Sequence, residues 1–194
     1  MPTPRSAAPI VASPDGSTLF IIGGFSKQND DQGVTHTDVF ALTQSRFSFT
    51  FNLFFKLIFF SDETSWQCRE VKVTGRKPEP RCGSSLQCYI NTCLLFGGVT
   101  DHDSDGIGTT ASAFLKNKNS ETSKTRSVFY NDLNRFDLQK LQWFPVEIKS
   151  DKNASAETGP SARMNAALVI KQGIVYVYGG LRELDEKKQV KILH

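Results

Sequence analysis

One pattern occurs three times along the sequence, and this repetition limits the folds that the chain can adopt. Each copy begins with an arginine, continues through two apolar stretches separated by a turn, and reaches two adjacent glycines 16 to 18 residues after the arginine. In the first two copies, an aspartate that leads an apolar segment and then a tryptophan follow. Self-similarity at such a period is typical of solenoids, propellers and arrays. The repeated residues are Arg5, Gly23, Gly24, Asp38 and Trp66, then Arg81, Gly97, Gly98, Asp132 and Trp143, then Arg163, Gly179 and Gly180.

This order of arginine, double glycine, aspartate and tryptophan resembles the kelch repeat, in which each copy forms one four-stranded blade of a β-propeller. The resemblance implies an all-β, kelch-type β-propeller fragment with two blades and the opening hairpin of a third. The expected blades comprise residues 5–73, 81–149 and 163–194. Because propellers have 4–8 blades, we expect missing blades of the same propeller on both sides, and only marginal stability for the chain alone.

Short apolar runs separated by turn residues predict a hairpin before each glycine pair. In the first copy, Ile10–Ala12 and Leu19–Ile22 flank a Ser-Pro-Asp-Gly turn, in which proline presets φ and glycine accepts a positive φ. The other two predicted hairpins comprise residues 86–96 and 166–178. Three similar hairpins indicate three blade cores.

The repeated residues are interpreted as structural. Glycine lacks a Cβ atom, so a glycine pair at a strand end lets neighbouring backbones approach or turn without strain. Trp66 and Trp143 begin the outermost strands, where each indole is expected to cover area between sheets as a core residue. Asp38 and Asp132 occupy equivalent positions on successive blades, so they do not form a carboxylate pair for acid/base chemistry.

An insertion over residues 45–60 interrupts the first expected blade. Its segment 47–60 contains seven phenylalanines in fourteen residues. A membrane helix needs ~20 predominantly apolar residues, and this run is shorter and contains Lys56. It is therefore not expected to span a membrane. We interpret it as translated non-coding sequence or as a lineage-specific insertion, with an aggregation-prone alternating pattern.

A polar loop over residues 101–127 interrupts the second expected blade. Its first residues, Asp-His-Asp-Ser-Asp-Gly, match the first half of a calcium-binding loop. The twelfth position, which normally holds a bidentate glutamate, is Ser112. The composition of the loop favours disorder and an ordinary acidic tip over a calcium site.

Charge and cysteine content exclude several classes of partner. The net charge of +3 is small and the basic residues are scattered, so no nucleic-acid partner is expected. The four cysteines lack the spacing of a zinc or redox motif and are expected to be free thiols packed in sheets: Cys68, Cys82, Cys88 and Cys93. Free thiols and an N-terminus without an apolar signal core predict a cytoplasmic location.

The residue patterns of common active sites are missing from the sequence. It contains no phosphate-binding glycine loop, no nucleophile elbow and only three histidines. The tyrosine, histidine and cysteine ligands of copper-oxidase propellers are not reproduced either. We therefore expect no enzyme activity, no catalytic residues, no cofactor and no metal.

The kelch resemblance implies a scaffold that binds other proteins, with recognition in loops that rigid blades hold. The candidate loops, residues 26–37, 101–127 and 181–188, all follow a double glycine and are expected at one rim. Two alternatives remain open: the substrate-receptor part of a ubiquitin-ligase assembly, which would need a recruiting domain, or a non-functional truncated gene product.

Overall fold

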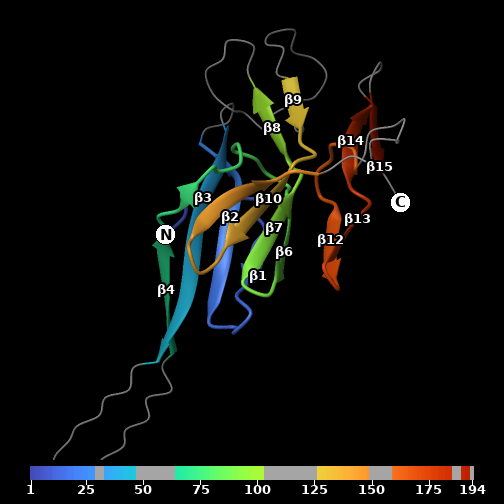
Figure 1. The fold of residues 1–194 in the computed structure, drawn as a ribbon. Helices are drawn as coiled ribbons and strands as arrows, with labels where there is room; N and C mark the ends of the chain where they lie inside the picture. The colour runs from blue at the N-terminus through green and yellow to red at the C-terminus, as the bar shows by residue number, and fades with distance from the viewer. Residues whose placement is uncertain (29–32, 47–63, 103–125, 149–158, 185–188, 193–194) are drawn as a thin grey trace, which may run out of the picture.

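The structure is a computed structural model that describes residues 1–28, 33–46, 64–102, 126–148, 159–184 and 189–192. Within these ranges every regular element is a β-strand, and the strands form three stacked layers (Figure 1). The all-β prediction is confirmed. The segment 47–60, the calcium-like sequence after His102 and most of the loop 101–127 lie outside the described residues.

The first sheet contains four antiparallel strands in the order β1-β2-β3-β4. Their bounds are β1 Ile10–Ala12, β2 Thr18–Lys27, β3 Gly33–Arg46 and β4 Thr64–Glu70. The predicted first hairpin is confirmed, because Ile10 pairs with Ile21 across its turn. Hydrogen bonds from Ser13 and Ser17 hold the turn and lower the pKa of Asp15 to about 2.

The second sheet has five strands in the order β5-β11-β10-β7-β6. Their bounds are β5 Thr74–Gly75, β6 Ser85–Tyr89, β7 Thr92–Phe96, β10 Leu133–Asp137 and β11 Gln142–Val146. Strand β5 follows β4 along the chain, yet it pairs in parallel with β11. The segment between the two sheets therefore ties the first sheet to the outer edge of the second.

A two-stranded hairpin forms the third layer, and two further hairpins project from the ends of the layers. The third layer is β12 Ala167–Lys171 paired with β13 Ile174–Tyr178. The projecting hairpins are β8 Val99–His102 with β9 Arg126–Phe129, and β14 Leu181–Leu184 with β15 Gln189–Ile192. Both follow a double glycine, and both lie at the upper end of the layers in Figure 1.

The core lies where the first two sheets face each other. It is buried because alternate residues of each strand point to the same face and meet the facing sheet. The Phe20 and Phe136 rings contact edge to face across this interface, with centroids 6.1 Å apart. The core side chains are Phe20, Ile22, Val39, Ala41, Val71, Cys93, Leu95, Phe136 and Trp143.

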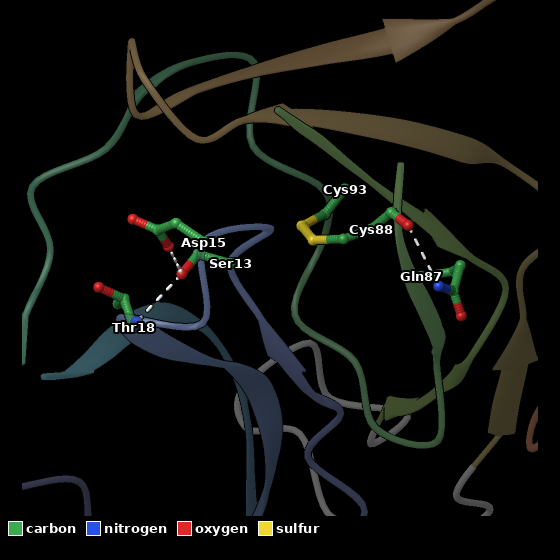
Figure 2. Close-up of a disulfide and its surroundings, with 6 residues drawn as sticks. All are labelled: Ser13, Asp15, Thr18, Gln87, Cys88 and Cys93. Carbon is green, nitrogen blue, oxygen red and sulfur yellow. Dashed lines mark hydrogen bonds between the residues drawn. A yellow bond between two sulfur atoms is a disulfide. The ribbon is translucent and has the colours of Figure 1, made fainter. Parts of the chain in front are cut away.

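Two of the cysteines form a disulfide, so the prediction of four free thiols is wrong. Cys88 and Cys93 face each other across the β6–β7 hairpin, with Cα atoms 4.0 Å apart, and Figure 2 shows the bond between their sulfur atoms. The two-residue turn at Ile90 and Asn91 makes them direct cross-strand neighbours, which are the closest side-chain pairs of a sheet. Cys68 and Cys82 are free. Only two of the four cysteines are therefore the free thiols on which the expectation of a reducing compartment rested.

The two tryptophans differ in their surroundings, contrary to the prediction that both are core residues. Trp143 is 1% exposed and packs on Phe136, whereas Trp66 is 53% exposed. Trp66 pairs with Gln44, so alternation along β3 places it on the face opposite to Ala41, which points into the core. The sheet buries its other face, and Trp66 lies outside the core for that reason.

Candidate interaction surface

The arginine that begins each repeat hydrogen bonds with its own glycine pair, which explains the spacing between them. Arg5 Nη1 donates to the Gly23 carbonyl at 3.0 Å and to Asp38 Oδ1 at 2.6 Å, while its Nη2 donates to Asp38 Oδ2 at 3.2 Å. This two-pronged geometry is the strong form of an arginine–carboxylate contact. The Arg5 side chain is almost completely buried.

The second repeat reproduces this arrangement. Arg81 Nη1 donates to the Gly97 carbonyl at 3.2 Å, and its two terminal nitrogens donate to the two carboxylate oxygens of Asp132. Its guanidinium carbon also lies 3.8 Å from the Tyr130 ring centroid. Burial raises the pKa of Tyr130, and the Arg81 charge opposes that rise. The aspartates predicted as structural thus hold the arginine of their own repeat.

The backbone of the same arginines joins consecutive layers. Arg81 N–H donates to the His36 carbonyl at 3.1 Å, and the Arg81 carbonyl accepts from Gly24 N–H at 3.2 Å. Arg163 repeats both bonds with Tyr130 and Gly98, at 3.0 Å and 2.9 Å. In the second and third repeats, the arginine therefore bonds to its own glycine pair through the side chain and to the preceding layer through the backbone.

The glycine pairs are required by these close approaches. Gly97 and Gly98 have φ values of 66° and 102°, in the region that L side chains rarely adopt. A Cβ atom on Gly97 would lie 2.4 Å from the Arg163 carbonyl oxygen. The prediction that these glycines let backbones approach each other is confirmed at this position.

The third repeat lacks the carboxylate found in the first two. Arg163 Nη1 donates to the Gly179 carbonyl at 2.9 Å, and its other nitrogens donate to the carbonyl and hydroxyl of Ser161. Within the described ranges no aspartate or glutamate forms an ion pair with Arg163. Burial lowers the pKa of Arg163, and the nearby charge of Arg182 lowers it further.

Polar side chains beyond the glycine pairs contact one another. Ser26, Thr35 and His36 lie in the candidate segment 26–37, but the sequence did not predict their contacts. Ser26 Oγ lies 2.7 Å from His36 Nε2, and Thr35 Oγ1 lies 3.0 Å from Thr100 Oγ1 on β8. Burial lowers the pKa of His36, the Arg5 charge lowers it further, and Asp38 opposes both. Side chains alternate along β3, so His36 lies on the same face as Asp38, and this spacing is the sequence signal that could have identified His36. The Ser26–His36 contact lies within the first sheet, whereas the Thr35–Thr100 contact joins that sheet to the β8–β9 hairpin.

The space beside these residues is small. A pocket lined by His36, Arg81 and Leu95 holds a volume of about 10 Å³, which suits one water molecule. Small-molecule sites typically enclose hundreds of cubic ångströms. This pocket therefore cannot take an organic substrate.

Within the residues that the structure describes, no group of three or more histidine, cysteine, aspartate or glutamate side chains is placed to hold a metal ion. None of these residues lies in a helix long and apolar enough to cross a membrane.

Comparison with known proteins gives one family model and a set of solved structures. The model described as the KLHDC2/KLHL20/DRC7 Kelch-repeats domain matches residues 1–194. A solved structure titled "Structure of YjhT" is similar to this chain at 16% sequence identity and a TM-score of 0.46. That similarity covers 98% of this chain and 41% of the other, so this chain spans less than half of the length of the solved one.

Proposed function

Because the chain belongs to the kelch-repeat family, whose domain model covers residues 1–194, we propose that it is a non-catalytic scaffold that binds other proteins through loops at one rim. The proposed blades comprise residues 5–73, 81–149 and 163–194. Within the family, we propose that the chain is most similar to the later blades of kelch domain-containing protein 4.

One observation carries the proposal: the hairpins that follow the glycine pairs project from layers that the arginines hold in place. Arg5 and Arg81 each hold an aspartate and a glycine carbonyl, and backbone bonds of Arg81 and Arg163 join the layers. Strands β8 and β14 begin directly after their glycine pairs. A rigid base with variable connections at its end is how scaffolds present binding residues.

Three segments are the proposed contact surface for a partner: residues 26–37, 101–127 and 181–188. They were expected as loops, but their ends lie in strands: β2 and β3 for the first, β8 and β9 for the second, and β14 for the third. The missing blades of the same propeller are the other proposed partners, and they would pack against the outer layers. We propose a structural and non-catalytic role for the repeated arginines, glycines, aspartates and tryptophans of the pattern, from Arg5 to Gly180.

The proposal is tested by replacing residues 103–125 with a Gly-Ser linker and comparing the proteins that bind the variant and the wild type, measured by quantitative mass spectrometry after proximity labelling. The control is Lys140→Glu, an exposed change in the turn between β10 and β11, away from the β8–β9 hairpin. We expect the linker variant to lose a defined set of partners that the control retains. Equal profiles for all three proteins would contradict recognition by this loop.

The identities of the partners separate the remaining readings. Ligase subunits among the lost partners would assign the chain to the substrate-receptor part of a ubiquitin-ligase assembly. A wild type that labels no partner above background, in cells where it is folded, would support the non-functional truncated product.

A further inference from the structure

The Cys88–Cys93 disulfide closes a hairpin that forms elsewhere in the chain without a covalent bond. The two cysteines pair across β6 and β7, and Cys93 lies four residues before Gly97. At the same position of the third repeat, Ile170 pairs with Val175 across β12 and β13. Both hairpins have a two-residue turn. Backbone pairing and this turn are therefore sufficient for the hairpin, and the cysteine pair is an addition of the second repeat.

The two sulfur atoms of this pair differ in their access to solvent. Cys93 is 0% exposed and belongs to the core cluster, whereas Cys88 is only partly buried. A small thiol in solution can therefore attack Cys88 Sγ but not Cys93 Sγ. The strand pairing holds the two Cα atoms 4.0 Å apart. Directly opposite residues of a ladder remain close whether or not they are bonded, so the opened pair stays within reach for the bond to form again.

The other two cysteines do not compete for this pair in the folded chain. Cys82 belongs to a different hydrophobic cluster, together with Val99 of β8. Cys68 pairs with Leu42, so alternation from Ala41, which points into the core, places it on the far face of the first sheet. Oxidation within the folded chain therefore has one product, the disulfide of the β6–β7 hairpin.

The cysteine pair lies at the interface between the first two sheets. Cys93 is part of the core cluster there, and both Cys88 and Val11 of β1 pack against that cluster. Strand β1 also contacts β6, which carries Cys88. The surroundings of the disulfide include Ser13 and Thr18, at the two ends of the turn between β1 and β2 (Figure 2). A change at the pair therefore reaches the contact between β1 and β6, which joins two layers.

Opening the bond changes the space that the pair occupies. Bonded sulfur atoms lie about 2 Å apart, whereas heavy atoms that are not bonded need a separation of about 3.5–4 Å. The core encloses Cys93 completely, so the displacement falls on Cys88 and on strand β6. The open pair therefore loosens the packing of β6 on β1.

We propose that Cys88 and Cys93 form a reversible redox switch, which exchanges with a low-molecular-weight thiol such as glutathione and alters the packing of the first sheet on the second. In opening, the thiolate of the small molecule attacks Cys88 Sγ, the S–S bond breaks, and Cys93 leaves as a thiolate that takes up a proton. A second small thiolate then attacks the small-molecule sulfur of the mixed disulfide, which releases the Cys88 thiolate to take up a proton and yields the disulfide of the small molecule. Two electrons thus pass from two small thiols to the protein, and closing reverses each step. This regulation goes beyond the proposed scaffold function and does not depend on the identity of a partner.

The test measures the redox state and the packing of the full 194-residue chain in glutathione buffers. The ratio of reduced to oxidised glutathione is varied over about a thousandfold. After an acid quench, open thiols are alkylated in denaturant, and mass spectrometry of the peptides quantifies the open and bonded pair. Hydrogen exchange at the two ends of the series reports the packing of β1 and β6. The matched control combines Cys88→Ile with Cys93→Val, which gives the second repeat the pair that the third repeat has at this position.

We expect the wild-type pair to convert reversibly between the bonded and the open state within this series. The amides of β1 and β6 should exchange at least about threefold faster in the open state, because a loosened contact opens at lower free energy. The control variant should exchange equally at both ends of the series, whereas Cys68→Ser, which keeps the pair, should behave as the wild type. If the control variant does not fold by circular dichroism, the two redox states of the wild type and of Cys68→Ser still decide the outcome.

Several results would overturn the proposal. A bond that stays closed in excess reduced glutathione until the chain unfolds would make it a permanent structural disulfide. A pair that stays open at every ratio would mean that the two cysteines act only as packed thiols. Equal hydrogen exchange of β1 and β6 in the two states would show that the bond does not affect the packing of the sheets. An equal response of the control variant would assign the change to the buffer.

Discussion

At the scale of single residues, Arg81 and Arg163 each form one set of hydrogen bonds through the side chain and another through the backbone. The guanidinium of Arg81 holds Asp132 and the Gly97 carbonyl, while its N–H and C=O bind His36 and Gly24 of the preceding layer. A substitution of the side chain leaves the backbone bonds in place. The two sets of bonds can therefore be separated by experiment.

We expect Arg81→Gln to lower the free energy of unfolding by about 2–3 kcal/mol, because it removes charge-assisted hydrogen bonds from a buried position. The partial exposure of Asp132, at 43% of its side chain, keeps the loss below that of a fully buried pair. Urea unfolding followed by tryptophan fluorescence measures the change. Arg81→Lys retains the charge but loses the two-pronged contact. Its free energy of unfolding should therefore lie between those of the wild type and of Arg81→Gln. An unchanged midpoint for Arg81→Gln would contradict the structural role of the pair.

His36 should make stability depend on pH. Its pKa is lowered in the folded chain, so the unfolded chain binds more protons in the range below the ordinary value of about 6.5. Stability therefore falls as the pH drops from 7.5 through 6.5 toward 5.5. The urea midpoint of the wild type should decrease over this range by more than that of His36→Gln. Parallel curves for the two proteins would show that His36 does not contribute.

At the scale of elements, glycines at the strand ends and turns are needed for two different reasons: a positive φ, or a positive φ together with a close backbone approach. Gly97 and Gly173 both have positive φ values, 66° and 78°. A Cβ atom would meet the Arg163 carbonyl oxygen at Gly97, whereas nothing lies within 4 Å of Gly173. The pair therefore distinguishes backbone strain alone from strain combined with a steric clash.

We expect Gly173→Ala to cost about 1–2 kcal/mol, the usual penalty for an L side chain in the left-handed region. Gly97→Ala should cost more, because the layer that contains Arg163 must also shift. Urea unfolding of the two variants side by side gives the difference. Equal losses would mean that the contact between layers is not required at Gly97.

The four cysteines are expected to differ in their reactivity toward alkylating reagents. Cys88 and Cys93 are bonded to each other, and burial raises the pKa of Cys82 to about 11, with the Asp101 charge adding to the rise. At pH 8 only about one Cys82 thiol in a thousand would be ionised, and the thiolate is the reactive form. Without reductant, iodoacetamide should label Cys68 first and Cys82 only after denaturation, as peptide mass spectrometry can show. Labelling of Cys88 or Cys93 before reduction would contradict the disulfide.

At the scale of the whole molecule, burial is concentrated between the first two sheets. Val39, Phe136 and Trp143 are almost inaccessible there, whereas the β12–β13 hairpin exposes one face and one edge. Regions with few buried apolar contacts open at low free energy. The stability of the molecule is therefore expected to be uneven.

Hydrogen exchange measured by mass spectrometry should show this difference. We expect the amides of β7 and β10 to exchange slowest and those of β12 and β13 to exchange fastest among the paired strands. Uniform protection across the three layers would contradict this distribution.

The features that the sequence alone predicted depend mainly on interactions between residues close together in the chain. The turn at residues 13–16, the hairpins and the repeated arginines, glycines and aspartates depend on short-range rules, since turn residues and strand alternation act between neighbours. The three-fold repetition extended these rules to stacked β-sheets and to the kelch family. Only the tertiary structure decided the rest. It showed the disulfide between Cys88 and Cys93, the exposure of Trp66 and the Thr35–Thr100 contact. The disulfide depends on the register of the β6–β7 hairpin, which the sequence alone did not fix. The exposure of Trp66 and the Thr35–Thr100 contact depend on which face a neighbouring sheet or hairpin covers, and such long-range relations are not encoded in any single segment.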